Sequence, residues 1–222
     1  MTKFNIKPNF DVLKARVNSA NNNSEIGFET KRNTNYDNSV VYTNTNVVTN
    51  GQNNGQNANF QIQLSVGGSS IGGGHTHPIG SYPVPSYGDL RFLRDCYEAA
   101  SSTRQEDVFY IAVCKDQNTG LVNTYCLQVE SFSILDLWIN NVWDDPKYSH
   151  LAVNSNERID EIHKDQAFIF ERSGSNYEKS FLEQFASFGI SLYQATDDTM
   201  TNWSKLSLGS TPTSTITKTP CN

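Results

Sequence analysis

Apolar residues recur along the first third of the chain at two different spacings. At positions 10–20 they come three or four residues apart, which predicts a short amphipathic helix. At 24–30, and more strictly at 60–66, apolar and polar residues alternate, as in a strand with one buried face. A further strand is expected at 71–77. This part of the chain therefore predicts one helix followed by strands of a sheet.

An asparagine-rich stretch separates the first of these strands from the others. Ten of the residues from 33 to 59 are asparagine, and two short islands at 39–42 and 46–49 each contain a pair of valines, as strands often do. Asparagine favours turns and tolerates left-handed backbone. We interpret the stretch as a strand with an exposed loop, and a disordered low-complexity segment is the alternative.

The remainder of the chain combines helical periodicity with one hairpin pattern. The tail after Gly209 is read as either an extended edge segment or a frayed terminus. Helices are expected at 86–101, 134–142, 157–170 and 177–188, and a hairpin at 107–114 and 121–129.

This order of elements predicts an α+β fold, in which helices flank a mixed β-sheet. A division near residue 130 is expected. Residues 1–130 would form the core domain, and 131–222 a helical C-terminal extension or cap of unknown role.

Charge and composition narrow the classes of partner. The chain has 222 residues, a formal net charge of −6 and no cluster of lysine and arginine longer than a pair, which argues against nucleic acid. Without a long apolar run, no membrane association is expected. Localisation stays open between the cytoplasm and the C-terminal part of a longer exported protein. The four cysteines are too far apart for a structural zinc motif and are read as reduced thiols.

The stretch from Gly72 to Asp89 carries the candidate chemistry. His75 and His77 are separated by one residue, so in an extended segment both side chains point to the same side. Asp89, at the start of the following helix, could complete a three-ligand metal site. The glycines at 72–74 do not fit a phosphate loop, because no Lys-Ser/Thr pair follows, and are read as a flexible or bulged approach to the site.

Each of these residues also has a simpler interpretation. Ser86 and Asp89 have the spacing of a helix capping box, in which each side chain bonds the backbone N–H of the other residue. That role is compatible with ligand binding. Glu25 could be a solvated carboxylate, and the two histidines could lie on a strand surface. His150 and His163 lie outside this stretch and are read as structural or solvated.

Taken together, Glu25, His75-Thr76-His77-Pro78, Ser86 and Asp89 resemble the JAMM motif of the JAB/MPN metalloprotease family, which has an upstream Glu, His-x-His-Pro and Ser-x-x-Asp. The resemblance extends from residue 25 to about 93. It implies a JAB/MPN-like (cytidine-deaminase-like) sheet and a zinc ion held by His75, His77 and Asp89, with water in the fourth position.

The resemblance also implies roles for two catalytic residues. Glu25 would accept the proton of the water and later deliver it to the leaving amine, and Ser86 would donate a hydrogen bond to the oxyanion. The loop from Pro78 to Pro85 is one residue longer than is common in the family, so Ser81 is the alternative hydroxyl. Glu29, on the same strand face as Glu25, is the alternative base.

The sequence thus predicts a zinc-dependent peptidase or isopeptidase that hydrolyses an amide bond in a peptide or protein substrate. The alternative is a non-catalytic module of the same fold whose C-terminal region binds a partner. Oligomeric state and substrate identity stay open.

Overall fold

The protein is described here by a computed structural model, which covers residues 6–20, 22–49, 60–153, 155–172, 174, 176–209 and 215–221. It is an α+β protein built on one eight-stranded sheet in the order β2-β1-β3-β4-β5-β6-β7-β8. The strands are β1 (Gly27–Thr34), β2 (Val40–Asn44), β3 (Ser70–Thr76), β4 (Phe109–Lys115), β5 (Val122–Val129), β6 (Ile190–Ala195), β7 (Trp203–Leu208) and β8 (Ile216–Pro220).

The sheet is mixed and open. β3 and β4 are paired parallel, whereas the other neighbouring strands run antiparallel. A parallel pair needs a crossover connection, and the chain makes it through α2 (Tyr87–Ala99). The helix expected to carry Asp89 is therefore the connection between the two central strands.

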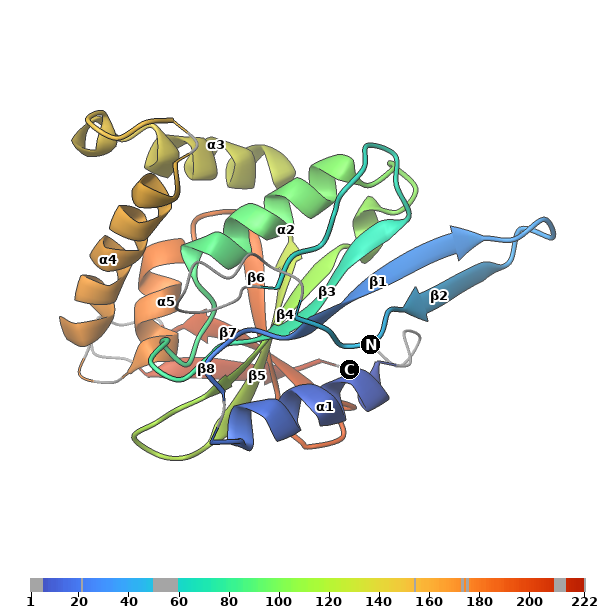
Figure 1. The fold of residues 1–222 in the computed structure, drawn as a ribbon, viewed down its shortest axis with the longest axis horizontal. Coiled ribbons are helices and arrows are strands. Elements are labelled where there is room, and N and C mark those ends of the chain that lie inside the picture. The colour runs from blue at the N-terminus through green and yellow to red at the C-terminus, as the bar shows by residue number, and fades with distance from the viewer. Residues whose placement is uncertain are drawn as a thin grey trace.

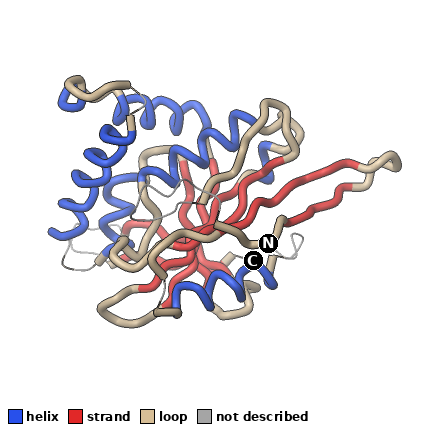
Figure 2. Tube along the Cα trace, viewed as in Figure 1, coloured by secondary structure: helices blue, strands red, loops and turns tan. Residues whose placement is uncertain are grey.

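Helices cover both faces of the sheet. Figure 1 shows α1 below the sheet and α2 above it, and Figure 2 shows that the other helices gather above and to the left, away from α1. In the part of the chain described, the remaining α-helices and two short 3₁₀ turns are α1 (Lys7–Asn18), α3 (Phe132–Trp143), α4 (Asn156–Arg172), α5 (Tyr177–Phe185), η2 (Gln105–Asp107) and η3 (Pro146–Tyr148).

Helix α2 is fixed to the sheet by its apolar stripe. Leu90, Leu93 and Cys96 recur at helical spacing and expose none of their surface. Burying each of the two leucines contributes about 2 kcal/mol. The first turn of α2, where Asp89 lies, is thus held on the face of β3 and β4.

The structure confirms most of the helices and strands expected from periodicity, including the β4–β5 hairpin. The prediction of a strand at 60–66 is wrong. Phe60 and Ile62 are buried and Gln61 is exposed, as the alternation predicts, but the segment is extended chain outside the sheet. The alternation of apolar and polar residues in this segment arises because one of its faces is buried. It does not indicate a neighbouring strand bonded to the segment.

The C-terminal third departs from the expected helical extension. α3, α4 and α5 are helices, but β6 and β7 are strands that the sequence did not predict, and β8 shows the tail to be an edge strand. β6 pairs with β5, so the sheet continues across residue 130. The division proposed there stays a prediction.

In the asparagine-rich stretch, β2 pairs with β1, and Val48 forms an isolated bridge with Gly27. The rest of that expected loop, 50–59, lies outside the described residues. Cys96, Cys114 and Cys126 are buried thiols and Cys221 is exposed, each without a disulfide. Among the described helices, none combines the length and apolar character that crossing a bilayer requires.

Candidate metal centre

Strand β3 lies between β1 and β4, and the glycines explain how it fits there. A Cβ on Gly72 would stand 1.7 Å from the carbonyl oxygen of Phe109, and one on Gly73 would stand 2.0 Å from that of Phe28. Both glycines also have positive φ angles, +115° and +158°. The glycine run is therefore an interior strand segment and not the flexible approach that the sequence suggested. Its pairing with β1 does shift register at Thr30/Lys31, as in a bulge.

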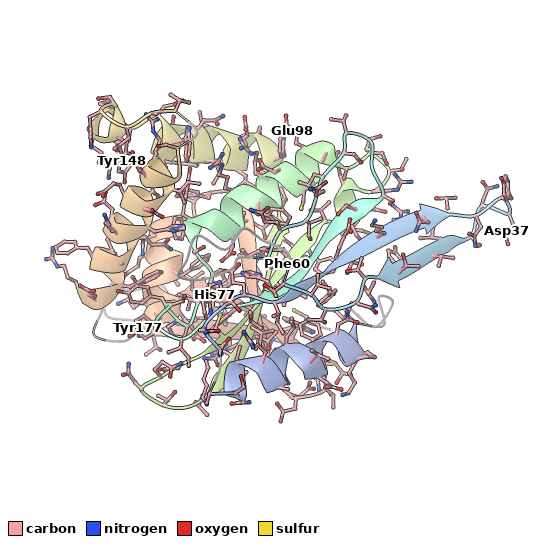
Figure 3. The ribbon with its side chains drawn as sticks, in the orientation of Figure 1. Asp37, Phe60, His77, Glu98, Tyr148 and Tyr177 are labelled. Carbon is pink, nitrogen blue, oxygen red and sulfur yellow. The ribbon has the colours of Figure 1, made fainter. Side chains whose placement is uncertain are left out.

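His75 and His77 are presented on the α2 face of β3. Their side chains are 2% and 8% exposed, which makes them far more buried than solvated strand histidines. His75 stacks on Tyr110 of β4, with ring centroids 4.7 Å apart. Figure 3 labels His77 toward the middle of the molecule, far from Asp37 at the tip of the β1–β2 hairpin. The surface-histidine interpretation is therefore wrong.

The capping box predicted at the start of α2 is present. The Ser86 hydroxyl accepts from the Asp89 backbone N–H at 3.3 Å, and Asp89 Oδ2 accepts from the Ser86 backbone N–H at 2.6 Å. Ser86 is the N-cap despite the longer loop before it, while Ser81 is exposed. The cap fixes the Asp89 carboxylate so that it faces β3.

His75, His77 and Asp89 converge. His75 Nε2 lies 3.1 Å from Asp89 Oδ1, and His77 Nε2 lies 3.2 Å from Asp89 Oδ2. One ligand atom from each residue lies within 4.8 Å of the others, so the three buried side chains could hold a metal ion. The structure thus brings together the three residues that the sequence proposed as ligands.

The opposite ring nitrogens define how each imidazole is oriented. His75 Nδ1 is 3.0 Å from the Ile111 carbonyl oxygen, and His77 Nδ1 is 3.1 Å from the Tyr82 carbonyl oxygen. A carbonyl only accepts, so each Nδ1 carries a proton and donates it. In the neutral imidazoles, the Nε2 lone pairs then face the Asp89 oxygens. Metal-ligating histidines have this arrangement of outer hydrogen bonds.

The centre favours positive charge. Burial alone would raise the pKa of Asp89, yet the imidazoles of His75 and His77 hold that pKa well below its usual range. Burial also disfavours the charged form of His77, but the neighbouring Cys114 and Asp89 side chains raise the pKa of His77 well above its usual value. Lone pairs that face a carboxylate repel it unless a proton or a cation lies between them, and one divalent cation would satisfy all three ligands.

Glu25 approaches the same sheet face from β1. Gly27 pairs with His75, and the Thr76 N–H donates to the Ile26 carbonyl, so the continued register places Glu25 opposite His77. Glu25 is half-buried, and its Oε2 accepts from the Phe60 backbone N–H at 2.9 Å. Its charge contributes to raising the pKa of Tyr110, after burial and Asp89. Glu29, the alternative base, instead pairs with Lys31 at 3.2 Å.

The Ser86 hydroxyl lies 3.1 Å from Asp89 Oδ2 and donates to it, while it also accepts from the Asp89 N–H. Its proton is therefore directed at the candidate ligand and not at open space. In this structure Ser86 positions Asp89, and its predicted role as oxyanion donor stays a prediction.

Two residues lie near the centre although the sequence did not assign them to it. Asn22, which is fully buried, donates to the His77 carbonyl at 3.0 Å and fixes the chain where it leaves β3. His163 of α4 lies against Gly88, one residue before Asp89. His163 was interpreted as structural or solvated, and it reaches the centre through tertiary packing, which no local pattern reports.

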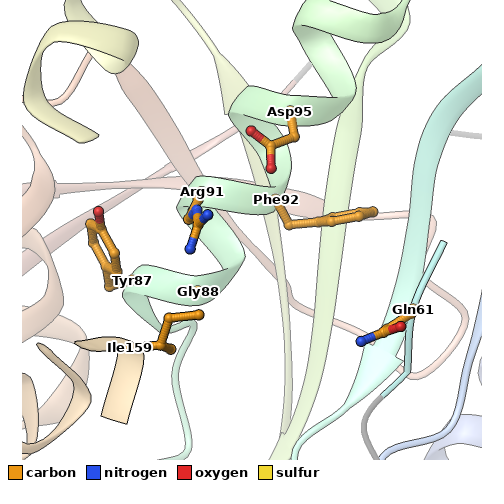
Figure 4. Close-up of a pocket in the computed structure, with 7 residues that line it drawn as sticks. All are labelled: Gln61, Tyr87, Gly88, Arg91, Phe92, Asp95 and Ile159. Atoms are coloured by element: carbon orange, nitrogen blue, oxygen red, sulfur yellow. The ribbon is translucent and has the colours of Figure 1, made fainter. Parts of the chain in front are cut away.

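A hollow of about 330 Å³ lies beside the start of α2 (Figure 4). Gly88 is on its wall, so the hollow borders the residue next to Asp89. Its lining residues come from the extended segment, α2 and α4, and are Gln61, Tyr87, Gly88, Arg91, Phe92, Asp95 and Ile159.

Comparisons of the chain with known protein families, with curated proteins and with solved structures gave no match.

Proposed function

We propose that this protein is a zinc-dependent peptidase or isopeptidase of the JAB/MPN type, with His75, His77 and Asp89 as metal ligands. One observation carries the proposal: two buried imidazoles, each oriented by a carbonyl at Nδ1, direct Nε2 at one ionised carboxylate. The order of α1, the strands, α2 and the β4–β5 hairpin is the order that the sequence resemblance implies as far as residue 129, which is consistent with the proposal.

The donor set suits zinc. Two imidazole nitrogens and one carboxylate oxygen leave a position open on Zn²⁺, which when bound lowers the pKa of a coordinated water and polarises a carbonyl. The same donor types also occur around non-haem iron(II). The metal content therefore has to be measured for both elements.

Glu25 supplies the base in this proposal. Water adds to the amide carbon while its proton passes to a Glu25 oxygen. The C–N bond then breaks, and that proton goes to the departing amine. Two structural facts support this role: the register that sets Glu25 opposite His77, and the Phe60 N–H that holds the carboxylate in place.

Zinc and iron content is the first test, measured by plasma mass spectrometry on protein prepared with added metal. We expect about one zinc ion per chain and almost none in His75→Ala. Cys221→Ser is the control, because Cys221 is an exposed thiol that could bind zinc adventitiously. A zinc content well below one ion per chain in the wild-type protein would contradict the proposal that it is an enzyme.

Hydrolysis is the second test, measured on a peptide library and on ubiquitin-like conjugates. Glu25→Gln should keep its zinc and lose about a thousandfold in kcat, because a positioned base is removed while the ligands stay. Glu29→Gln is the matched control, since Glu29 shares the strand face but pairs with Lys31. Wild-type rates in Glu25→Gln would refute the base assignment. A zinc-loaded wild type that cleaves nothing would favour the non-catalytic binding module.

A further inference from the structure

His163 is a half-buried residue beside the centre with no assigned role. It lies on α4, and its Nε2 is buried without a hydrogen-bond partner among the described residues. An unsatisfied buried polar atom costs about 1–3 kcal/mol. Such an atom beside a candidate metal centre calls for a functional explanation.

His163 Nε2 and the Ser86 hydroxyl converge on the same point. A Cβ added to Gly88 would stand 3.3 Å from each of these two atoms. Glycine at position 88 therefore leaves room for the imidazole to come close to the first turn of α2. That turn carries Asp89, so His163 faces the helix end that supplies a candidate ligand.

Three of the charged groups that act on His163 belong to the centre. Burial lowers the pKa of His163, while Asp89 and Glu25 of the centre and Asp160 of α4 raise it and His77 lowers it. An imidazole that carries its proton on Nε2 donates a hydrogen bond from that atom.

Helix α4 is held rigidly at this position. Gln166, one turn after His163, accepts from the Tyr87 backbone N–H at 3.0 Å, and Ile162 is buried in the core. Ile159, one turn before His163, lines the hollow together with Gly88. The hollow thus borders α2 and α4, the helix that carries His163, and Gly88 lies both on its wall and against the His163 ring.

We propose that His163 contacts the substrate and donates a hydrogen bond from Nε2 to the oxygen of the scissile carbonyl. This inference rests on the proposed function. The Ser86 proton is directed at Asp89 Oδ2, whereas His163 Nε2 has no hydrogen-bond partner among the described residues, so His163 is a donor available for developing negative charge. α4 then contributes a side chain to the reaction.

The test uses Co²⁺-loaded full-length protein and acetohydroxamate, a chelator that offers a carbonyl oxygen and an anionic oxygen at the metal. Its affinity is read from the visible cobalt band, so no substrate is needed. His163→Ala should bind acetohydroxamate about ten- to a hundredfold more weakly, with unchanged cobalt stoichiometry. His163→Gln, whose amide N–H₂ can take the place of Nε2, should recover part of the affinity, and His163→Asn should not.

His150→Ala is the matched control, because His150 is exposed and belongs to the same part of the chain. Unchanged acetohydroxamate affinity in His163→Ala, or cobalt-loaded wild type that does not bind the chelator, would overturn the role of His163 alone. Loss of cobalt from His163→Ala would overturn it as well, since His163 would then be a ligand. Wild-type protein that takes up no metal would overturn the proposed function and this inference together.

Discussion

Asp89 and Asp107 are two carboxylates buried to nearly the same extent, 6% and 5% exposed, in different surroundings. Asp107 Oδ2 lies 3.2 Å from Arg32 Nε and accepts from the Tyr42 hydroxyl at 2.7 Å. Asp89 instead faces two imidazoles. Arginine is always charged, whereas histidine is charged only when protonated.

The difference separates a structural carboxylate from a candidate metal ligand. The charge of Asp107 is balanced permanently inside the protein, so nothing from outside is needed. The charge of Asp89 is balanced by groups that can exchange a proton for a metal ion. For a buried acid, the chemistry of the partner therefore says more about function than burial does.

The largest expected effect concerns metal affinity. Asp89→Asn should weaken zinc binding by at least about a thousandfold, because losing a ligand should exceed the ten- to hundredfold effect of outer-shell partners. Asp107→Asn should bind zinc as the wild type does. Competition with a chromogenic zinc chelator measures both affinities. Equal affinity in Asp89→Asn and the wild type would erase the distinction between the two acids.

The next effect is on stability, and here Asp107→Asn is expected to cause the larger loss and Asp89→Asn the smaller one. Asp107→Asn should lower the free energy of unfolding by about 3 kcal/mol, because Arg32 would stay largely buried and lose the nearer of its two carboxylate partners, which leaves only Glu106 at 4.0 Å. Asp89→Asn, compared with wild type in EDTA, should lose less of the free energy of unfolding, since its partners His75 and His77 can release a proton and become neutral. Urea unfolding followed by circular dichroism gives both values. A larger loss for Asp89→Asn would make Asp89 a structural acid too.

The smallest effect concerns the cap that orients Asp89. Ser86→Ala should cost about 1 kcal/mol of stability, because α2 loses its N-cap side chain. Zinc affinity should fall about tenfold, as for other outer-shell partners. The Ser86 backbone N–H still binds Asp89 Oδ2, so the loss should stay modest. Urea unfolding measures the change in stability, and competition with the zinc chelator measures the change in zinc affinity. Ser81→Ala is the control and should change neither.

The candidate centre could be predicted from sequence where its geometry is local. His75 and His77 share a strand face by their spacing alone, and Ser86 with Asp89 defines a helix start. Only the packing of that helix against β3 could not be predicted from local sequence. The α+β class followed from the same short-range periodicity.

Features that depend on distant partners could not be predicted in this way. Phe60 alternates with its neighbours as strand residues do, but its backbone N–H goes to Glu25 and not to another strand. β6 and β7 are short, and the pairing of β6 with β5 joins residues more than sixty positions apart, such as Val129 and Ile190. His163 reaches Gly88 by the docking of α4 on α2, so it shows no signal in the sequence around it.

The crossover from β3 through α2 to β4 has a consequence for the order of assembly. Its ends pair in parallel within a segment of 46 residues, Ser70 to Lys115, and the three candidate ligands all lie in its first half. Short loops close at lower entropic cost and earlier than long ones. The three candidate ligands can therefore gather before Glu25, which precedes this segment, and His163, which follows it, pack against them.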